Sequence, residues 1–196
     1  TGDTTDLATA RNDFRTLDPA RLDSHDRVQL LVGLGEALYL DSLYGPSADM
    51  FAVALEEVAP FGPDERNRLL DWWASALSAE AQLHETDRRS PYYQAMVERM
   101  RQEQLADPRS SVAAYWTVAG ERGLGDLDRA WSDAIASWVR APLMDKSDQL
   151  RRDLDRLVVT AIIPERAREL APTPPDAATT AADLRAEWEV VKAKWK

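Results

Sequence analysis

A pattern of large and small apolar residues recurs three times along this sequence at the spacing of an α-helix. In the first copy the pattern is formed by Leu31, Leu34, Gly35 and Leu38, followed on a second predicted helix by Phe51 and Ala54. A glycine inside a helix costs about 1 kcal/mol relative to alanine, so Gly35 predicts a close approach of that second helix. Ala74 and Gly120 occupy the corresponding small positions in the later copies. The sequence therefore predicts an all-α fold in which antiparallel helix pairs stack side by side.

Proline, glycine and capping residues set the limits of the predicted helices. The first three helices are expected at residues 5–17, 24–40 and 47–58. A fourth begins near residue 64, and Ser90 followed by Pro91 predicts the start of its partner. A third pair turns at residues 123–125, and a last long helix from residue 147 is expected to kink or restart at Pro164.

The C-terminal part of the sequence differs from the repeats before it. Residues 171–178 read APTPPDAA, a proline-rich composition that predicts an extended linker between a helical domain at residues 1–170 and a final helix at residues 179–196. That helix is amphipathic, with Leu184, Trp188, Val191 and Trp195 on one face. We expect it to fold back on the helical stack, to bind a second copy in a homo-oligomer, or to lie on another subunit of a complex.

Composition excludes several classes of partner. The chain of 196 residues carries 34 acidic and 24 basic residues, a net charge of -10, so nucleic acid is not an expected partner. Its apolar stretches are too short to span a bilayer, and without cysteine it has neither disulfides nor thiolate ligands.

Because the sequence starts at Thr1 rather than Met, we expect a periplasmic or secreted protein whose export signal has been removed, with a trimmed cytoplasmic chain as the alternative.

No residue pattern predicts catalysis, a metal or a cofactor. The two histidines, His25 and His84, lack the spacing of a metal-binding helix motif. Glycine pairs at 33/35 and 123/125 have no preceding strand and do not form a phosphate-binding loop. Acidic neighbours such as Glu56 and Glu57 point in different directions on a helix. We therefore expect a protein that is not an enzyme.

The repeated pattern resembles the tetratricopeptide repeat (TPR) family over about residues 24–141. The first copy carries the resemblance, with Ser47 in the alanine-like position and Pro60 one residue later than the usual terminal proline. The later copies match less well, since Gly123 stands where a large apolar residue is usual. The resemblance implies a right-handed superhelix with a concave face, formed by the first helix of each pair, that binds peptides or protein segments. It implies no catalytic residue.

Six residues are candidates for binding a partner. They are Glu36, Tyr39, Trp72 and Tyr115 on the predicted first helices, and Trp188 and Trp195 on the final helix. Trp72 and Tyr115 have an alternative role as core residues, because aromatic side chains at helical spacing usually pack inside.

The leading functional hypothesis is a non-enzymatic, TPR-like scaffold that binds a protein or peptide in a helical groove. The alternative is a helical protein of the cell envelope that holds a small ligand in an aromatic-lined pocket. An open groove favours the first, whereas an enclosed pocket of roughly 300–1,000 Å³ favours the second. A third hypothesis, an all-helical enzyme with paired acids, requires buried acids with perturbed pKa values that converge on one cleft.

Overall fold

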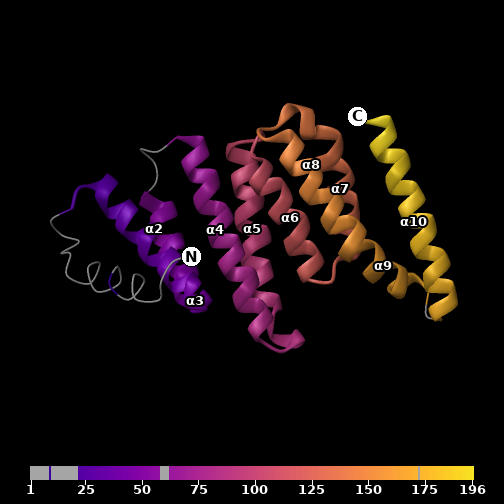
Figure 1. Ribbon diagram of the computed structural model, residues 1–196, viewed down its shortest axis with the longest axis horizontal. Helices are drawn as coiled ribbons and strands as arrows, with labels where there is room; N and C mark the ends of the chain where they lie inside the picture. The colour runs from indigo at the N-terminus through magenta and orange to yellow at the C-terminus, as the bar shows by residue number, and fades with distance from the viewer. Residues whose placement is uncertain (1–8, 10–21, 58–61, 172) are drawn as a thin grey trace. The chain divides into compact units, whose positions relative to one another are not determined.

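The computed structural model describes Thr9 and residues 22–57, 62–171 and 173–196, and in these residues all regular secondary structure is helical (Figure 1). The all-α prediction is therefore confirmed for this part of the chain. The helix predicted at residues 5–17 lies outside the described residues, apart from Thr9. The chain divides into two compact units, Thr1–Thr86 and Asp87–Lys196, and each is described by itself below.

The first unit contains three described helices: α2 (Ser24–Leu40), α3 (Tyr44–Glu57) and α4 (Pro63–Leu83). Helix α3 packs against both α2 and α4, which confirms the first predicted hairpin. The side chain of Asp23 caps α2 by accepting a hydrogen bond from the backbone N–H of Asp26 at 2.9 Å. Helix α3 begins earlier than predicted, because Pro46 is compatible with a first helical turn and Gly45 donates its N–H to Glu80 at 2.8 Å.

The small residues of the repeated pattern are points of close contact. Gly35 meets the helix that follows it, as predicted, whereas Gly120 meets the helix that precedes it and not the second helix of its predicted pair. A Cβ atom added to Gly35 would lie 2.8 Å from the ring of Phe51, and one added to Gly120 would lie 2.7 Å from Cγ2 of Val97. Ala74 is fully buried. Ser47 fastens the first contact, since its hydroxyl donates to the carbonyl oxygen of Gly35 at 2.8 Å.

The second unit is built from six described α-helices. They are α5 (Ser90–Ala106), α6 (Ser111–Gly123), α7 (Leu127–Arg140), α8 (Ser147–Leu157), α9 (Ile163–Leu170) and α10 (Pro174–Lys194). Two short 3-10 helices cover Thr86–Arg88 and Ala141–Leu143. Helix α6 packs against α5, α7 and α8. The second predicted hairpin joins helices of different units, and each of them packs within its own unit, α4 on α3 and α5 on α6.

The irregularity predicted at Pro164 is present. A wide π-helical turn at Val158–Ile162 connects α8 to α9, and Pro164 lies in the first turn of α9. Proline has no backbone N–H to donate and clashes with the preceding turn. The chain therefore restarts a helix here.

The predicted linker at 171–178 is wrong from Pro174 onward, where α10 begins. Prolines are tolerated in a first helical turn, where no intrahelical hydrogen bond is needed. Asp176 suits the positive end of the helix, and its carboxylate accepts a hydrogen bond from the hydroxyl of Thr173. Figure 1 shows the chain reversing direction between α9 and α10, and α10 packs against α9 and α7.

Tryptophans from distant helices meet in the core of the second unit. The ring of Trp188 lies 5.2 Å from that of Trp138 and 6.1 Å from that of Trp131, measured between centroids. Asp155 of α8 accepts hydrogen bonds from the indole N–H of Trp188 and from the ammonium of Lys192, both at 2.8 Å. These contacts fasten α10 within its own unit, so the final helix folds back on the chain that carries it.

Candidate functional site

A hollow of about 250 Å³ lies between α2 and α4 in the first unit. It is lined chiefly by Val28, Val32, Gly33 and Glu36 of α2 and by Arg68 and Leu69 of α4. The residues of α2 share one face because they recur at helical spacing. Gly33 presents no side chain at the middle of this row, which leaves room above the backbone.

The hollow has an apolar floor and a charged rim. Val28 and Leu69 are almost fully buried, whereas Glu65 and Arg68 form an exposed pair with 3.5 Å between their charged atoms. Glu36 is half-buried on the opposite helix and makes no hydrogen bond or ion pair with another described residue. Its carboxylate is therefore available to an incoming group.

An aromatic cluster continues this surface by one helical turn. Tyr39 follows Glu36 on α2, and Trp72 follows Leu69 on α4; their ring centroids are 5.3 Å apart. Tyr44 lies 5.1 Å from Tyr39, and all three rings are half-buried. We call the hollow together with Tyr39 and Trp72 the α2–α4 face. It brings together three of the residues predicted to bind a partner.

The indole ring of Trp72 also packs against the core of the first unit. Its ring stacks on that of Phe51, with centroids 5.7 Å apart and planes inclined by 18°. Phe51 is fully buried and is the residue that covers Gly35. The two roles considered for Trp72 are thus combined, since one side of the indole packs inward while part of the side chain stays exposed.

The other three predicted residues lie in the second unit. Tyr115 is half-buried, packs against the core and meets Trp116 edge to face at 5.3 Å. Trp188 is fully buried, so its prediction as a partner contact is wrong in this fold: its indole fills the core and its N–H is held by Asp155. Trp195 remains 44% exposed, with the ammonium of Lys194 5.5 Å above its ring.

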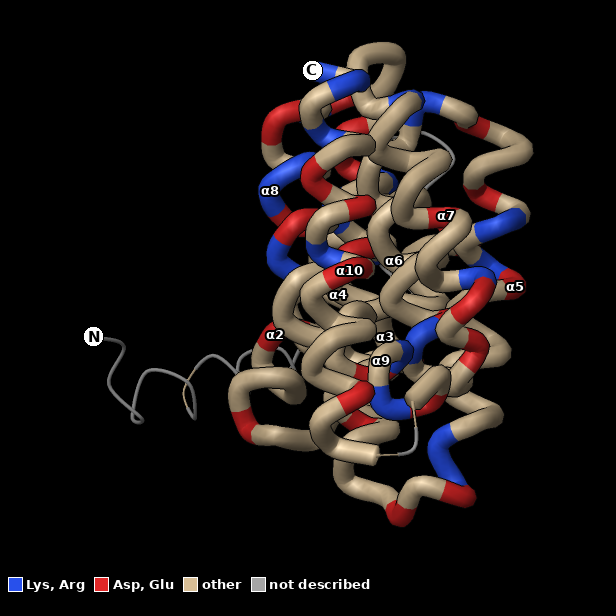
Figure 2. Tube along the Cα trace, turned by 90° about the vertical axis from the view of Figure 1, so that its right-hand side faces the viewer, with Lys and Arg blue, Asp and Glu red and all other residues tan. Residues whose placement is uncertain are grey.

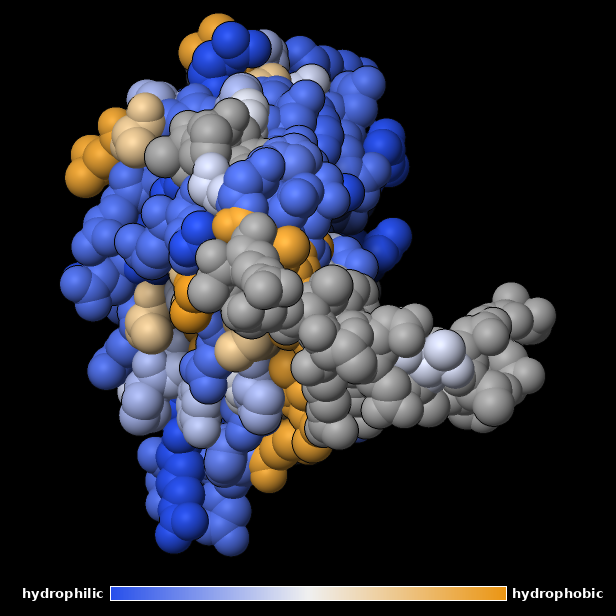
Figure 3. All heavy atoms as spheres, turned by 90° about the vertical axis from the view of Figure 1, so that its left-hand side faces the viewer, coloured by the Kyte–Doolittle hydropathy of each residue, from blue (hydrophilic) through white to orange (hydrophobic). Residues whose placement is uncertain are grey.

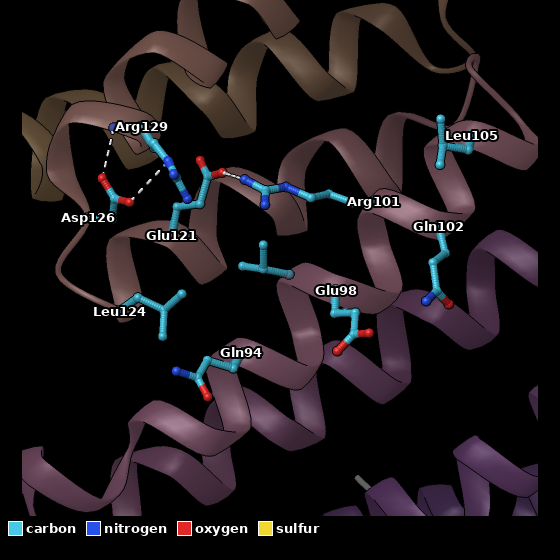
Figure 4. A pocket seen from close by; sticks show the side chains of 10 residues that line it. Gln94, Glu98, Arg101, Gln102, Leu105, Glu121, Leu124, Asp126 and Arg129 are labelled. Atoms are coloured by element: carbon cyan, nitrogen blue, oxygen red, sulfur yellow. Dashed lines mark hydrogen bonds and ion pairs between the residues drawn. The ribbon is translucent and has the colours of Figure 1, made fainter.

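A larger hollow of about 480 Å³ lies in the second unit, between α5 and the end of α6 (Figure 4). None of the predicted residues lines it. Figure 4 shows Arg101 of α5 reaching toward Glu121 of α6, and its guanidinium donates to Oε1 of Glu121 at 2.7 Å. Asp126 and Arg129 form a second pair at the rim, 3.3 Å apart.

Glu121 is a buried acid that the sequence analysis missed. Its side chain is about 1% exposed, and burial, followed by the hydrogen bond and charge of Asp133, raises its pKa to about 7 against the opposing effect of Arg101. Its second oxygen, Oε2, is buried with no hydrogen-bond donor among the described residues. Asp133 is a second carboxyl group beside Glu121, so a proton held between the two groups removes their repulsion and supplies a hydrogen bond. The available sequence signal was its position four residues after Thr117, on the buried stripe of α6.

This geometry is that of a structural link. Arg101 occupies one oxygen of Glu121 and the protein encloses the other, so neither is open to a substrate in this conformation. General acid–base catalysis requires a carboxyl within hydrogen-bond reach of the substrate. The hydrogen bond between Arg101 and Glu121 joins α5 to α6, and its strength depends on whether Glu121 is protonated.

The described residues contain no group of His, Asp and Glu side chains placed to hold a metal ion. His84 directly follows α4, and its Nε2 lies 3.0 Å from Oε1 of Glu80 in the last turn of that helix. None of the described helices is long and apolar enough to cross a membrane. No family model matches the chain, and comparisons with curated proteins and with solved structures give no significant match.

Proposed function

We propose that this protein is a non-enzymatic, TPR-like interaction protein that binds a segment of a partner protein on the α2–α4 face. The observation that carries the proposal is the arrangement of Glu36, Tyr39 and Trp72 on two helices beside an open hollow. Partly exposed aromatic side chains next to a depression are the usual anchors of protein recognition. All three residues were predicted from the position of first helices in the repeats.

The packing order of the helices supports a repeat architecture. In the first unit α2 contacts α4 as well as α3, and in the second unit α6 contacts α8 as well as α7. Helix α7 likewise contacts α9 as well as α8. Alternate helices are thus neighbours within each unit, as expected where hairpins stack in register. The right-handed superhelix is the arrangement that we propose these pairs follow.

The form of the hollows favours a protein segment over an enclosed small molecule. The α2–α4 hollow is smaller than most drug-sized pockets and has exposed Gln29, Glu65 and Arg68 at its rim. The larger hollow of the second unit has the volume of a ligand pocket, yet the described residues that line it include no aromatic side chain. The aromatic-lined pocket of the alternative hypothesis therefore has no counterpart there.

Recovery of a partner with face variants tests the proposal. We expect wild-type protein and the Asp49→Arg variant to retain the same partner from an extract of the native source, and Tyr39→Ala to lose it. Asp49 is exposed on α3 and does not line the hollow. With the purified partner, loss of an aromatic anchor should weaken binding by about 2 kcal/mol, roughly thirtyfold.

Titration calorimetry measures this change, and circular dichroism confirms that the variants are folded. A purified partner that binds wild type and Tyr39→Ala equally would place the interface elsewhere. A substrate turned over by the purified protein would contradict the non-enzymatic proposal.

A further inference from the structure

The negative charge of this protein is concentrated in one of its units. Residues 1–86 contain 16 Asp and Glu against 6 Arg and no Lys, whereas residues 87–196 contain 18 acidic and 18 basic residues. The whole net charge of -10 therefore belongs to the first unit. A unit with such an excess attracts cationic partners over distances of about a Debye length, roughly 8 Å at physiological salt.

The α2–α4 face also carries a net negative charge. Arg68 is the only basic residue that lines the hollow within the described chain, and Glu65 pairs with it at 3.5 Å. This pair leaves the carboxylate of Glu36 as the uncompensated charge of the rim, since no described residue pairs with it. A cation from a partner is the group that completes this arrangement.

The aromatic cluster adds a second attraction for a cation. Tyr39 lies one turn beyond Glu36, and its ring meets the ring of Trp72 at an interplanar angle of 75°. An ammonium or guanidinium group over an aromatic face is stabilised by the quadrupole of the ring, most strongly over tryptophan. A carboxylate and two partly exposed rings within one helical turn are the chemistry that recognises a Lys or Arg side chain.

An apolar anchor fits beside the cation. The floor of the hollow is made of Val28, Val32 and Leu69. Val32 lies four residues before Glu36 on α2 and Leu69 lies three residues before Trp72 on α4, so each separation is about one helical turn, roughly 5.4 Å. In an extended peptide, side chains on the same side recur about every 6.8 Å. Residues two apart in such a peptide therefore match the two subsites.

We infer that the α2–α4 face binds a basic segment of its partner, in which a Lys or Arg side chain lies against Glu36, Tyr39 and Trp72 and an aliphatic side chain two residues away enters the hollow. This inference rests on the proposed function and specifies the chemistry of the partner. Figure 3 shows exposed apolar side chains between polar ones on the face in view. Leu40, Leu43 and Val53 are the large apolar side chains most exposed on α2, α3 and the turn between them.

Peptide selection on the full-length protein tests both the face and its charge preference. A displayed library of random 12-residue peptides is selected on immobilised wild type and on Trp72→Ala. We expect the peptides that need Trp72 to be rich in Lys or Arg placed two positions from an aliphatic residue. Synthetic copies of the leading peptides are then titrated by fluorescence anisotropy.

Charge reversal supplies the decisive comparison. Glu36→Arg should weaken the leading peptide about tenfold or more, and Asp49→Arg, which makes the same charge change on α3, should leave affinity within about twofold. Glu36→Gln, which keeps the size of the side chain, should show a smaller loss of the same sign. Raising salt from about 50 to 200 mM should weaken wild type several-fold and Glu36→Gln less.

The outcomes separate the two proposals. Selected peptides that are acidic or uncharged, but still require Trp72, would overturn the basic partner and leave the binding face intact. Peptides that bind wild type and Trp72→Ala equally, or no selected peptide at all, would overturn the α2–α4 face itself and with it the basic segment. Circular dichroism of each variant distinguishes lost binding from lost structure.

Discussion

The two units use the same kinds of side chain for different purposes. In the first unit, Tyr39, Tyr44 and Trp72 form a cluster that stays partly exposed. In the second unit, Trp131, Trp138 and Trp188 are buried against one another. The aromatic side chains of the first cluster remain available to a partner, whereas the second cluster stabilises the unit that contains it.

Charged residues show the same contrast. Acidic and basic segments alternate along α8 in the second unit (Figure 2). Several charged side chains of the second unit join one helix to another. Arg122 of α6 donates two hydrogen bonds to Glu165 of α9, and this contact raises the pKa of Arg122 although burial opposes it. In the first unit the carboxylate of Glu36 stays without a described partner. A unit with balanced charge stabilises itself, whereas an acidic one gains from a cationic ligand.

The junction between α8 and α10 shows how the second unit compensates for burying polar groups. Burial alone would raise the pKa of Asp155, but hydrogen bonds from Lys192 and Trp188 bring it below its usual value. The pKa of Lys192 is raised by the same contact and by Glu189, against the effect of burial. Each partner thus favours the charged form of the other, so the junction is strongest near neutral pH.

Removing one indole from each unit is expected to have the largest effect on stability. Trp188 is fully buried, so Trp188→Ala should lower the free energy of unfolding by about 3–5 kcal/mol. Trp72 is half-buried, and Trp72→Ala should cost about half as much. Urea unfolding followed by far-ultraviolet circular dichroism measures both.

Trp195→Ala is the matched control, because Trp195 is on the same segment as Trp188 but remains 44% exposed. Its replacement should change stability by less than about 1 kcal/mol. Equal losses for Trp188→Ala and Trp72→Ala would break the contrast between a buried cluster and an exposed one.

The pH dependence of stability is expected to come next in size. The pKa of Glu121 rises from 4.5 to about 7 in the folded protein, so between these values the folded state holds a proton that the unfolded state releases. The free energy of unfolding should therefore fall as pH rises through this window, by about 3 kcal/mol in all, and level off above it. Asp155 acts in the opposite sense, and its contribution is lost as pH falls toward and below 3.8.

Glu121→Gln isolates the group responsible. A glutamine amide accepts a hydrogen bond from Arg101 and donates one to Asp133 at every pH, as protonated Glu121 does. The variant should therefore match wild type near pH 5 and exceed its stability near pH 8, in urea titrations at both values. A stability that falls between pH 5 and 8 equally in both proteins would assign the effect to other groups.

The smallest of the three effects concerns the contact inside the first unit. Gly35→Ala would place a Cβ 2.8 Å from the ring of Phe51, and overpacking of this kind costs about 1–3 kcal/mol. Without that contact the same substitution would stabilise a helix by about 1 kcal/mol. The sign of the change in a urea unfolding experiment is thus the test, and a gain in stability would contradict the close contact.

Much of the local structure was predictable from the sequence. Helix α2 begins and ends at the predicted residues because Asp23 caps it and Asp41 follows its end. Gly35 and Gly120 were identified as contact points because glycine inside a helix needs a packing reason. Of the candidate site, Glu36, Tyr39 and Trp72 were found from their place on first helices, whereas Trp188 was misassigned because an amphipathic stripe does not say what covers it.

The sequence by itself determined where most of the helices lie and that Gly35 and Gly120 are contact points, because caps, prolines and apolar periodicity act over a few residues. Only the tertiary structure decided that Glu121 is buried beside Asp133, that α10 starts at Pro174 and covers its own unit, and that the aromatic rings of α2 and α4 meet. These features depend on residues far apart in the chain. Their burial and pKa values arise only when packing brings such residues together.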